Sequence, residues 1–426
     1  MKRVPASIIA SIAVSIGCVA LYQSTFAQTA SPAAPAESPP TPASEAPAPS
    51  PAERGKYLAD AGNCVSCHTR PRGAPFSGGL GFDTPFGMIY STNITPDSET
   101  GIGKWTAQDL RAAMHEGSGP GGRLFPAFPY TSFTKVTDAD VAAIYAYLRT
   151  LQPVKYTPPR NGMLFSMRWP LAIWNALFFK PERYAPNPKQ SEEWNRGAYL
   201  VEGLGHCSAC HTPRNMFMAE DAKRAYAGGV INSEVAKDKS RRWSAVNLTS
   251  SKSGLGAWSV NDLTKYLQTG YSARAGSFGP MNEVIVNSLK KLKTGDLKAM
   301  AVYLKSLPAQ DYTGPGVTAD QTKEGAGIYK DRCEKCHSGS GRGGLFSGPP
   351  VAGSAIVLAE DPASLINVIL YGPATVKDIS TGAWETMPSY ADILSDRQVA
   401  AVANFLRGSW DNRAPAVAEK DVTAQR

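Results

Sequence analysis

The sequence predicts an all-α fold of three tandem domains. The pentapeptide Cys-x-x-Cys-His occurs three times, at residues 64–68, 207–211 and 333–337. The segment before the first copy is repeated before the second, since Arg54-Gly55-Lys56-Tyr57-Leu58 corresponds to Arg196-Gly197-Ala198-Tyr199-Leu200. The length of 426 residues also fits about three domains of about 150 residues each. Together, these observations indicate one small helical domain around each pentapeptide.

Each pentapeptide is an attachment sequence for c-type haem. Its two cysteines form thioethers with the haem vinyl groups, and the adjacent histidine is the proximal iron ligand. A thioredoxin-like redox pair needs only one Cys-x-x-Cys, and a structural zinc site needs two such pairs close together in the sequence. We therefore predict three cytochrome c domains, each around one covalently bound haem c. The predicted attachment residues are Cys64, Cys67, Cys207, Cys210, Cys333 and Cys336, and the predicted proximal ligands are His68, His211 and His337.

The N-terminal segment predicts export. Residues 1–27 combine two early basic residues, an apolar run from Ile8 to Tyr22 and small residues up to Ala27, which is typical of a secretory signal peptide. The alternatives are an uncleaved anchor and lipidation at Cys18. Residues 28–52 are mostly Ala, Pro, Ser and Glu and are predicted to be a disordered linker. Because c-type haem is attached outside the bacterial cytoplasm, we expect the chain on the periplasmic side of the cytoplasmic membrane.

The basic composition does not indicate a nucleic-acid partner. The formal net charge is +8, and removal of Lys2 and Arg3 with the signal peptide would leave +6. Three haems would bring six propionates, which balance much of that charge. The sequence also contains no dense Lys/Arg tract with interleaved aromatic residues.

The first domain is predicted at residues 53–155. A short helix leads into the first pentapeptide, and a Gly/Pro-rich loop follows it. Leu110 and Met114 share one face of a predicted helix over 106–116, and a closing helix is predicted over 138–148. A first helix that carries the haem and a last helix that packs around it are the plan of a small cytochrome c domain.

The second domain is predicted at residues 191–310 and repeats the first. Asn247-Leu248-Thr249 corresponds to Asn93-Ile94-Thr95, which indicates duplication of a whole domain. The third domain, at residues 311–411, is shorter, with a closing helix over 396–407. The last residues, 412–426, are predicted to form a mobile tail.

An apolar linker is predicted between the first two domains, at residues 156–190. Its segment 163–179 is too short, and too interrupted by Arg168 and Pro170, to span a bilayer. We expect this segment to pack between the two domains. The alternative is a surface that docks on a membrane or on a partner subunit, because Trp and Phe beside basic residues suit both.

The proximal histidines each need a partner for the second ring nitrogen, commonly a backbone carbonyl. A proline follows each pentapeptide in a position to offer one. The candidates are Pro71, Pro213 and Pro349, which otherwise form turns.

The distal ligands differ among the three sites. A Met from a loop before the last helix is the usual sixth ligand in an electron-transfer cytochrome c, which predicts Met281 for the second haem and Met387 for the third. The corresponding loop of the first domain carries Phe128, which cannot bind iron. His115 is the candidate replacement, with a surface histidine at a helix end or a five-coordinate iron as alternatives. His206 is predicted to support the haem edge.

Several longer runs resemble one family. They are Tyr90-Ser-Thr-Asn-Ile-Thr-Pro-Asp97, the run from Trp194 to Arg214, and Met387-Pro-Ser. These runs resemble the triheme cytochrome c subunit of bacterial membrane-bound dehydrogenases, which act on alcohols, aldehydes, sugars and gluconate. The resemblance covers about Glu53 to Asp411 and implies the same proximal and distal ligands.

The resemblance implies a function as an electron-transfer subunit. The chain would take electrons from a catalytic dehydrogenase subunit with PQQ, flavin or molybdopterin and pass them through three haems to ubiquinone. Phe128 is associated with relatives that serve molybdenum-type aldehyde dehydrogenases, which is the alternative within this class. The sequence contains no nucleophile–base pair, Walker loop or dinucleotide fingerprint, so the chain is not expected to be an enzyme on its own.

Two functions of another class remain as alternatives. A multihaem peroxidase would need an open distal site, which only the first domain could supply. A free periplasmic electron shuttle would need no fixed partner, which three fused domains and an apolar linker disfavour.

Overall fold

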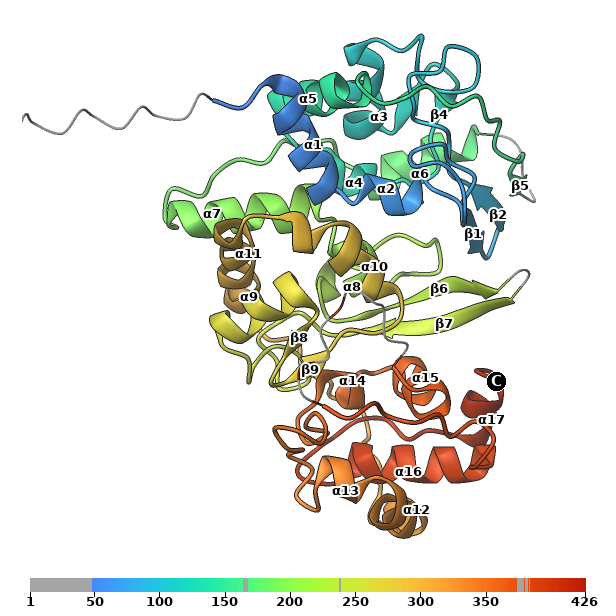
Figure 1. The fold of residues 1–426 in the computed structure, drawn as a ribbon, viewed down its shortest axis with the longest axis vertical. Coiled ribbons are helices and arrows are strands. Elements are labelled where there is room, and N and C mark those ends of the chain that lie inside the picture. The colour runs from blue at the N-terminus through green and yellow to red at the C-terminus, as the bar shows by residue number, and fades with distance from the viewer. Residues whose placement is uncertain (1–47, 164–167, 237–238, 374–378, 380–381, 383) are drawn as a thin grey trace, which may run out of the picture. The chain divides into compact units, whose positions relative to one another are not determined.

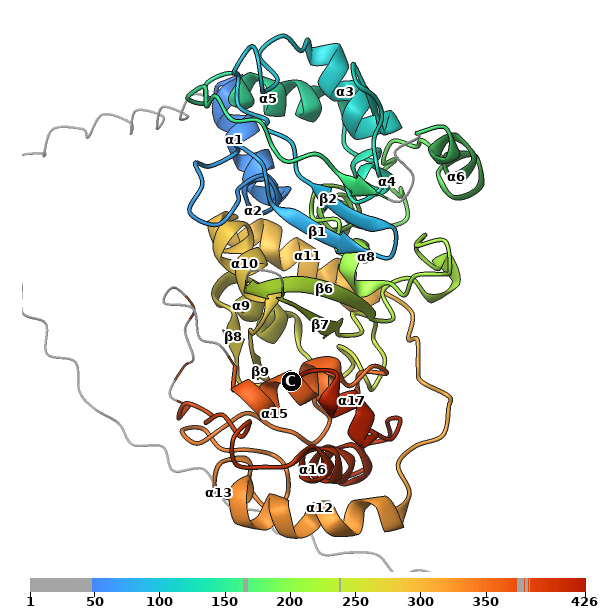
Figure 2. The ribbon, with the colours of Figure 1, turned by 90° about the vertical axis from the view of Figure 1, so that its right-hand side faces the viewer.

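The structure is a computed structural model that describes residues 48–163, 168–236, 239–373, 379, 382 and 384–426. The predicted signal peptide, Cys18 and most of the predicted N-terminal linker lie outside the described residues. Residues 49–426 form one compact unit, and Figures 1 and 2 show its elements from two directions.

The first part of this unit is helical with small sheets. A capping box of Ser50 and Glu53 starts the first helix, and Thr106 and Asp109 form another at the start of the third. The helices are α1 (Pro51–Ala61), α2 (Cys64–Cys67), α3 (Ala107–Glu116), α4 (Tyr130–Phe133) and α5 (Asp138–Leu148). The strands are β1 (Gly81–Thr84), β2 (Gly87–Tyr90), β3 (Ser118–Gly119), β4 (Gly122–Arg123) and β5 (Gly162–Met163), of which β1, β2 and β5 form one sheet.

The second part repeats this order of elements. The helices are α6 (Pro170–Phe178), α7 (Glu192–Tyr199), the π-helix η1 (Leu200–Leu204), α8 (Ser208–His211), η2 (Ala222–Arg224), α9 (Val260–Thr269), α10 (Pro280–Asn287), η3 (Leu289–Lys291) and α11 (Thr294–Ser306). The strands are β6 (Gly229–Ala236), β7 (Lys239–Ala245), β8 (Tyr271–Ser272) and β9 (Ala275–Gly276). The antiparallel pair β6–β7 follows the second pentapeptide as β1–β2 follows the first.

The third part contains helices but no named strand among its described residues. These helices are α12 (Ala319–Arg332), α13 (Glu334–His337), α14 (Ala355–Leu358), α15 (Ala363–Tyr371), α16 (Asp396–Gly408) and α17 (Glu419–Thr423). The prediction of helices around each pentapeptide is confirmed. The chain is largely helical, as predicted, but it also contains the hairpins β1–β2 and β6–β7, which the prediction of an all-α fold did not include.

The C-terminal residues pack against the third part. Val417 and Val422 are buried, and the Asn404 side chain donates a hydrogen bond to the Val417 carbonyl at 2.9 Å. The Arg426 guanidinium pairs with Asp396. The prediction of a mobile tail over 412–426 is therefore wrong. Single apolar residues separated by polar ones gave no periodic signal from which this packing could be read.

A close crossing of two helices recurs in all three parts. Helix α1 packs on α5, α7 on α11 and α12 on α16. A Cβ added at Gly55 would lie 1.8 Å from the Ala143 carbonyl oxygen. A Cβ added at Gly197 would lie 1.9 Å from the Ala299 carbonyl oxygen. In the third part, the Cβ position at Gly325 lies 2.1 Å from the Ala401 carbonyl oxygen. A side chain does not fit at these three crossings, so glycine permits the contact.

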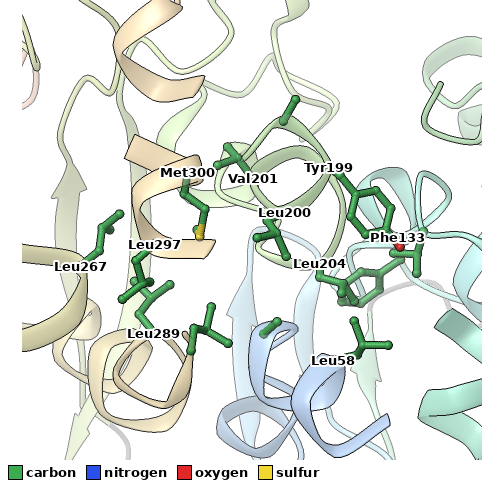
Figure 3. Packing of buried hydrophobic residues seen from close by; sticks show 14 of the residues in the cluster. Leu58, Phe133, Tyr199, Leu200, Val201, Leu204, Leu267, Leu289, Leu297 and Met300 are labelled. Carbon is green, nitrogen blue, oxygen red and sulfur yellow. The ribbon is translucent and has the colours of Figure 1, made fainter. Parts of the chain in front are cut away.

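The buried apolar residues form two clusters. One extends from Leu58 to Leu304 and therefore runs through both the first and the second part. Figure 3 shows where they meet: Leu58 and Phe133 of the first part lie beside Leu204 of the second. The other cluster extends from Tyr329 to Val422. The first two parts thus share one core, whereas the third part has its own.

The helix crossing can be tested within one helix. Gly325→Ala should lower the free energy of unfolding by about 2 kcal/mol, because overpacking typically costs about 1–3 kcal/mol. Gly327 lies two residues further along α12, and no described atom lies within 4 Å of the Cβ position there. Gly327→Ala should therefore raise the free energy by about 0.5–1 kcal/mol. Calorimetry of the haem-loaded chain measures both, and equal stability of the two variants would contradict the crossing.

Candidate haem-binding sites

The three proximal histidines are each held by a backbone carbonyl. The His68 Nδ1–H donates to the Thr92 carbonyl at 2.7 Å, and the His211 Nδ1–H donates to the Val246 carbonyl at 2.7 Å. The His337 Nδ1–H donates to the Pro349 carbonyl at 2.8 Å. A carbonyl only accepts, so the proton lies on Nδ1 and the Nε2 lone pair is available to iron.

The proline hypothesis is confirmed only in the third domain. Pro349 provides the carbonyl there, but the predictions for Pro71 and Pro213 are wrong. The hairpins β1–β2 and β6–β7 are the physical reason. They carry the chain away from the pentapeptide, and it returns to the histidine only after the second strand.

A buried Asn-x-Thr motif fixes each of these returning segments. Asn93 follows Thr92, accepts hydrogen bonds from Thr95 and donates one to the Val154 carbonyl at 2.7 Å. Asn247 follows Val246 in the same way, accepts from Thr249 and donates to the Gln310 carbonyl at 2.8 Å. In the sequence, this motif indicates only that a domain is repeated. Its repetition at one place in two domains was the available signal for a role at the haem site.

A large cavity joins the first two sites. It has a volume of about 2120 Å³, and its lining includes Cys67 and Cys210 from the two pentapeptides. Pockets for one small molecule usually measure about 300–1,000 Å³, so this cavity has room for more than one such group. Burial and the neighbouring Cys210 thiol raise the pKa of Cys67 to about 12. One cysteine of each pentapeptide therefore faces the cavity, together with largely apolar walls, which suits attachment of haem at its edge.

The two predicted distal methionines pack against the two apolar clusters. Met281 lies in α10 and packs against the cluster that Cys207 also contacts. Met387 packs against the cluster that Cys333 contacts. Glu385, two residues before Met387, lies 3.9 Å from the Cys336 sulfur. Cluster membership does not bring either sulfur to a proximal histidine, and ligation by Met281 and Met387 stays a prediction.

The predicted ligand His115 lies in the interior of the first part of the chain. It is fully buried in α3, with Nδ1 3.3 Å from a carboxylate oxygen of Asp138. Burial and the Arg183 charge lower the pKa of His115 to about 4, against the opposing effect of Asp138. His115 is not among the described residues that line the cavity, but neither are His68 and His211, so the lining does not decide ligation. It is the contact with Asp138 that favours a structural role for His115.

Aromatic rings pack together at the predicted distal loop of the first domain. The Phe128 ring lies 5.3 Å from the Phe133 ring, between centroids. The imidazole of His206, from the second domain, lies 5.5 Å from the same Phe133 ring on an edge-to-face contact. His206 also lines the cavity. The predicted haem-edge position of His206 thus coincides with the first domain's distal loop.

Two equivalent polar clasps join the first two domains. In one, Arg54 pairs with Asp140, and the Tyr199 hydroxyl of the second domain donates to Asp140 at 2.6 Å. The other exchanges the roles of the two domains. Arg196 pairs with Asp296, and the Tyr57 hydroxyl of the first domain donates to Asp296 at 2.6 Å. Each domain therefore completes an ion pair of the other, and the two haem sites are fixed relative to one another.

The apolar linker is both packed and exposed. On the inner face of α6, the Tyr130 hydroxyl donates to Asn175 at 2.7 Å and the Trp174 indole donates to the Phe217 carbonyl at 2.9 Å. These contacts confirm packing against both domains. The outer face is exposed, with relative accessibilities of 62% for Trp169, 53% for Ile173 and 68% for Leu177, and these three residues are also among those that line the cavity. Within the described part of the chain, no helix is long and apolar enough to cross a bilayer.

Two family models match the chain. The cytochrome c model matches residues 52–152. The model of cytochrome c oxidase, cbb3-type, subunit III matches residues 320–406. Neither match covers the second domain, which is linked to the first by the repeated sequence and the repeated clasp.

Similar proteins are subunits of dehydrogenases. The gluconate 2-dehydrogenase cytochrome c subunit of Pantoea cypripedii is 41% identical over 404 residues, covering 88% of this chain and 89% of that protein. The alcohol dehydrogenase (quinone), cytochrome c subunit of Komagataeibacter europaeus is 39% identical, covering 88% and 84%. One of the subunits of nicotinate dehydrogenase from Pseudomonas putida is 42% identical and covers 85% of this chain. The chain spans only 31% of that longer protein.

His115 should make the folded protein sensitive to acid. Its pKa is about 4 in the folded protein and 6.5 ordinarily, so the unfolded chain alone takes up this proton between the two values. Stability is therefore complete above pH 6.5 and falls as the pH falls to 4. At about 1.4 kcal/mol per pH unit, the loss is about 3 kcal/mol. His115→Asn should flatten this dependence, as measured by denaturant unfolding across that pH range.

The same variant tests the placement of His115. Its haem EPR signals should match those of the original protein. A pH dependence as steep as in the original protein would contradict the burial argument, and the loss of one haem signal would restore His115 as a ligand.

Proposed function

The chain belongs to the family of cytochrome c subunits of dehydrogenases, and from this premise we propose that it carries electrons through three covalently bound haem c groups. It would receive them from a catalytic dehydrogenase subunit. The observation that carries this proposal is the common geometry at His68, His211 and His337, whose Nδ1 atoms are all held by backbone carbonyls. Three equivalent sites on one chain suit a relay of single electrons.

The residues of each site have distinct tasks. Haem c, when bound, supplies one-electron redox chemistry. The paired cysteines fix its orientation, and the carbonyl partners Thr92, Val246 and Pro349 keep each proximal imidazole in the tautomer that can bind metal. The clasps between the first two domains keep their sites at a constant separation. Electron transfer depends steeply on that separation, so a rigid junction favours it.

The proposal also includes the protein that supplies the electrons and the molecule that finally accepts them. A dehydrogenase subunit with PQQ, flavin or molybdopterin would oxidise an alcohol, aldehyde or sugar, and ubiquinone would accept the electrons. The relatives are cytochrome subunits by name, which disfavours a free electron shuttle or a peroxidase for this chain.

The outer face of α6 is the proposed contact with the membrane surface on the periplasmic side. Trp169, Ile173 and Leu177 form an exposed apolar stripe, and Arg168 and Lys180 lie just beyond the two ends of the helix. This combination suits the interface between lipid headgroups and acyl chains. Replacing Ile173 and Leu177 with serine should move the chain from the membrane fraction to the soluble fraction. An unchanged distribution would contradict this assignment.

The proposed function is tested by purification of the chain with its native partners. We expect a larger subunit to co-purify, and we expect that subunit's substrate to reduce all three haems of the complex. The isolated chain should contain three haems, by a pyridine haemochrome assay, and should not oxidise the substrate. Fewer than three haems would contradict the cofactor count. Substrate oxidation by the isolated chain would contradict the electron-transfer role.

Met281 and Met387 are the proposed distal ligands of the second and third haems. A thioether ligand raises the potential relative to a second histidine. Met281→His and Met387→His should therefore each lower the potential of one haem and leave the other two unchanged. A spectroscopic redox titration of the full chain measures this, with Met216→His as the control, because Met216 is 85% exposed. If either variant titrates like the control, that methionine is not a ligand.

A further inference from the structure

His206 occupies an unusual backbone position between two functional segments. It follows the π-helix η1 and directly precedes Cys207. Its φ is +36°, in the left-handed region that few residues other than glycine adopt. Asn63 holds the equivalent position before Cys64, with φ +50°. Asparagine enters this region readily because its short side chain bonds locally. The backbone at this position therefore does not require a histidine.

The imidazole of His206 points across the junction of the two domains. It makes an edge-to-face contact with Phe133, at 5.5 Å between ring centroids. Phe133 in turn contacts Phe128, the residue at the place of a distal methionine. His206 also shares the cavity with Cys67 of the first pentapeptide and Cys210 of the second. The ring is thus next to the distal loop of one site while its backbone is joined to the attachment residue of the other.

The electrostatics of this position keep the ring uncharged. Burial lowers the pKa of His206 below its ordinary value, so the imidazole is neutral at pH 7. A neutral ring can fill the space beside a haem edge, whereas loss of hydration would destabilise a charged imidazole there. It excludes water from the first site, whose own loop contributes Phe128.

We propose that His206 is a positioning residue that couples the first haem to the second. This inference rests on the proposed haem sites. Its imidazole would lie beside the first haem, next to the loop that carries Phe128, and its peptide bond to Cys207 would give a short bonded path to the second haem. Water exclusion raises a haem potential, because water stabilises the more highly charged ferric state. His206 therefore raises the potential of the first haem and speeds electron exchange with the second.

The test uses His206→Asn, which places the residue of the equivalent position, Asn63, in a backbone that accepts it. In the full chain with three haems, one midpoint potential should fall while the other two stay unchanged. Redistribution of electrons after rapid partial reduction should be several-fold slower. Met216→Asn, at a side chain that is 85% exposed and belongs to no proposed site, should alter neither quantity.

A second variant approaches the contact from the other domain. Phe133→Leu removes the ring that His206 packs against while it keeps an apolar side chain, and it should lower the potential of the same haem. This variant decides the question if His206→Asn does not mature. Unchanged potentials and exchange rates in a variant that holds three haems would overturn the role of His206 and leave the proposed function intact. A haem count below three in the original protein would instead overturn the proposed function.

Discussion

The close approach of two helix backbones at a glycine is the contact on which each site depends. At Gly55, Gly197 and Gly325, a side chain would collide with a carbonyl oxygen of the closing helix. Each glycine lies in the helix that leads into a pentapeptide, so this crossing fixes where the haem-bearing turn lies relative to the last helix. Methylene-scale changes in such packed contacts are felt throughout a small core. The three sites therefore share a geometry because they share this crossing.

The three domains do not share their contacts with one another. The first two meet through a common apolar core and two reciprocal clasps, in which Tyr57 and Tyr199 play equivalent parts. The third domain has Gly327 at the corresponding place along its first helix. It meets the second part through polar contacts, including the pair of Arg242 and Asp361 and the bonds between Ser244 and Ser364, and through the aromatic contact of Tyr271 with Trp384. The chain is thus a joined pair of sites with a third attached differently.

The sequence was a good guide to what is local and repeated. The pentapeptides, the helix pattern and the duplication all lie within short windows, and the structure has helices at each of them. The carbonyl partners Thr92 and Val246 could not be read in this way, because hairpins of their own separate them from the histidines they bind. Few histidines lie outside the pentapeptides, which is why the sequence suggests His115 as a ligand. The number of histidines does not predict which residues a given histidine contacts in the fold. The contact with Asp138 depends on how α3 and α5 pack.

The first site differs from the others in where its polar neighbours come from. Its own loop offers Phe128, and the imidazole of His206, from the second part of the chain, packs against the neighbouring Phe133. Residues from both parts therefore meet at the first candidate site. The hydrogen bonds from Tyr199 to Asp140 and from Tyr57 to Asp296 hold these two parts together. The surroundings of a haem at this site would thus depend on the interface between the two parts and not on one part alone.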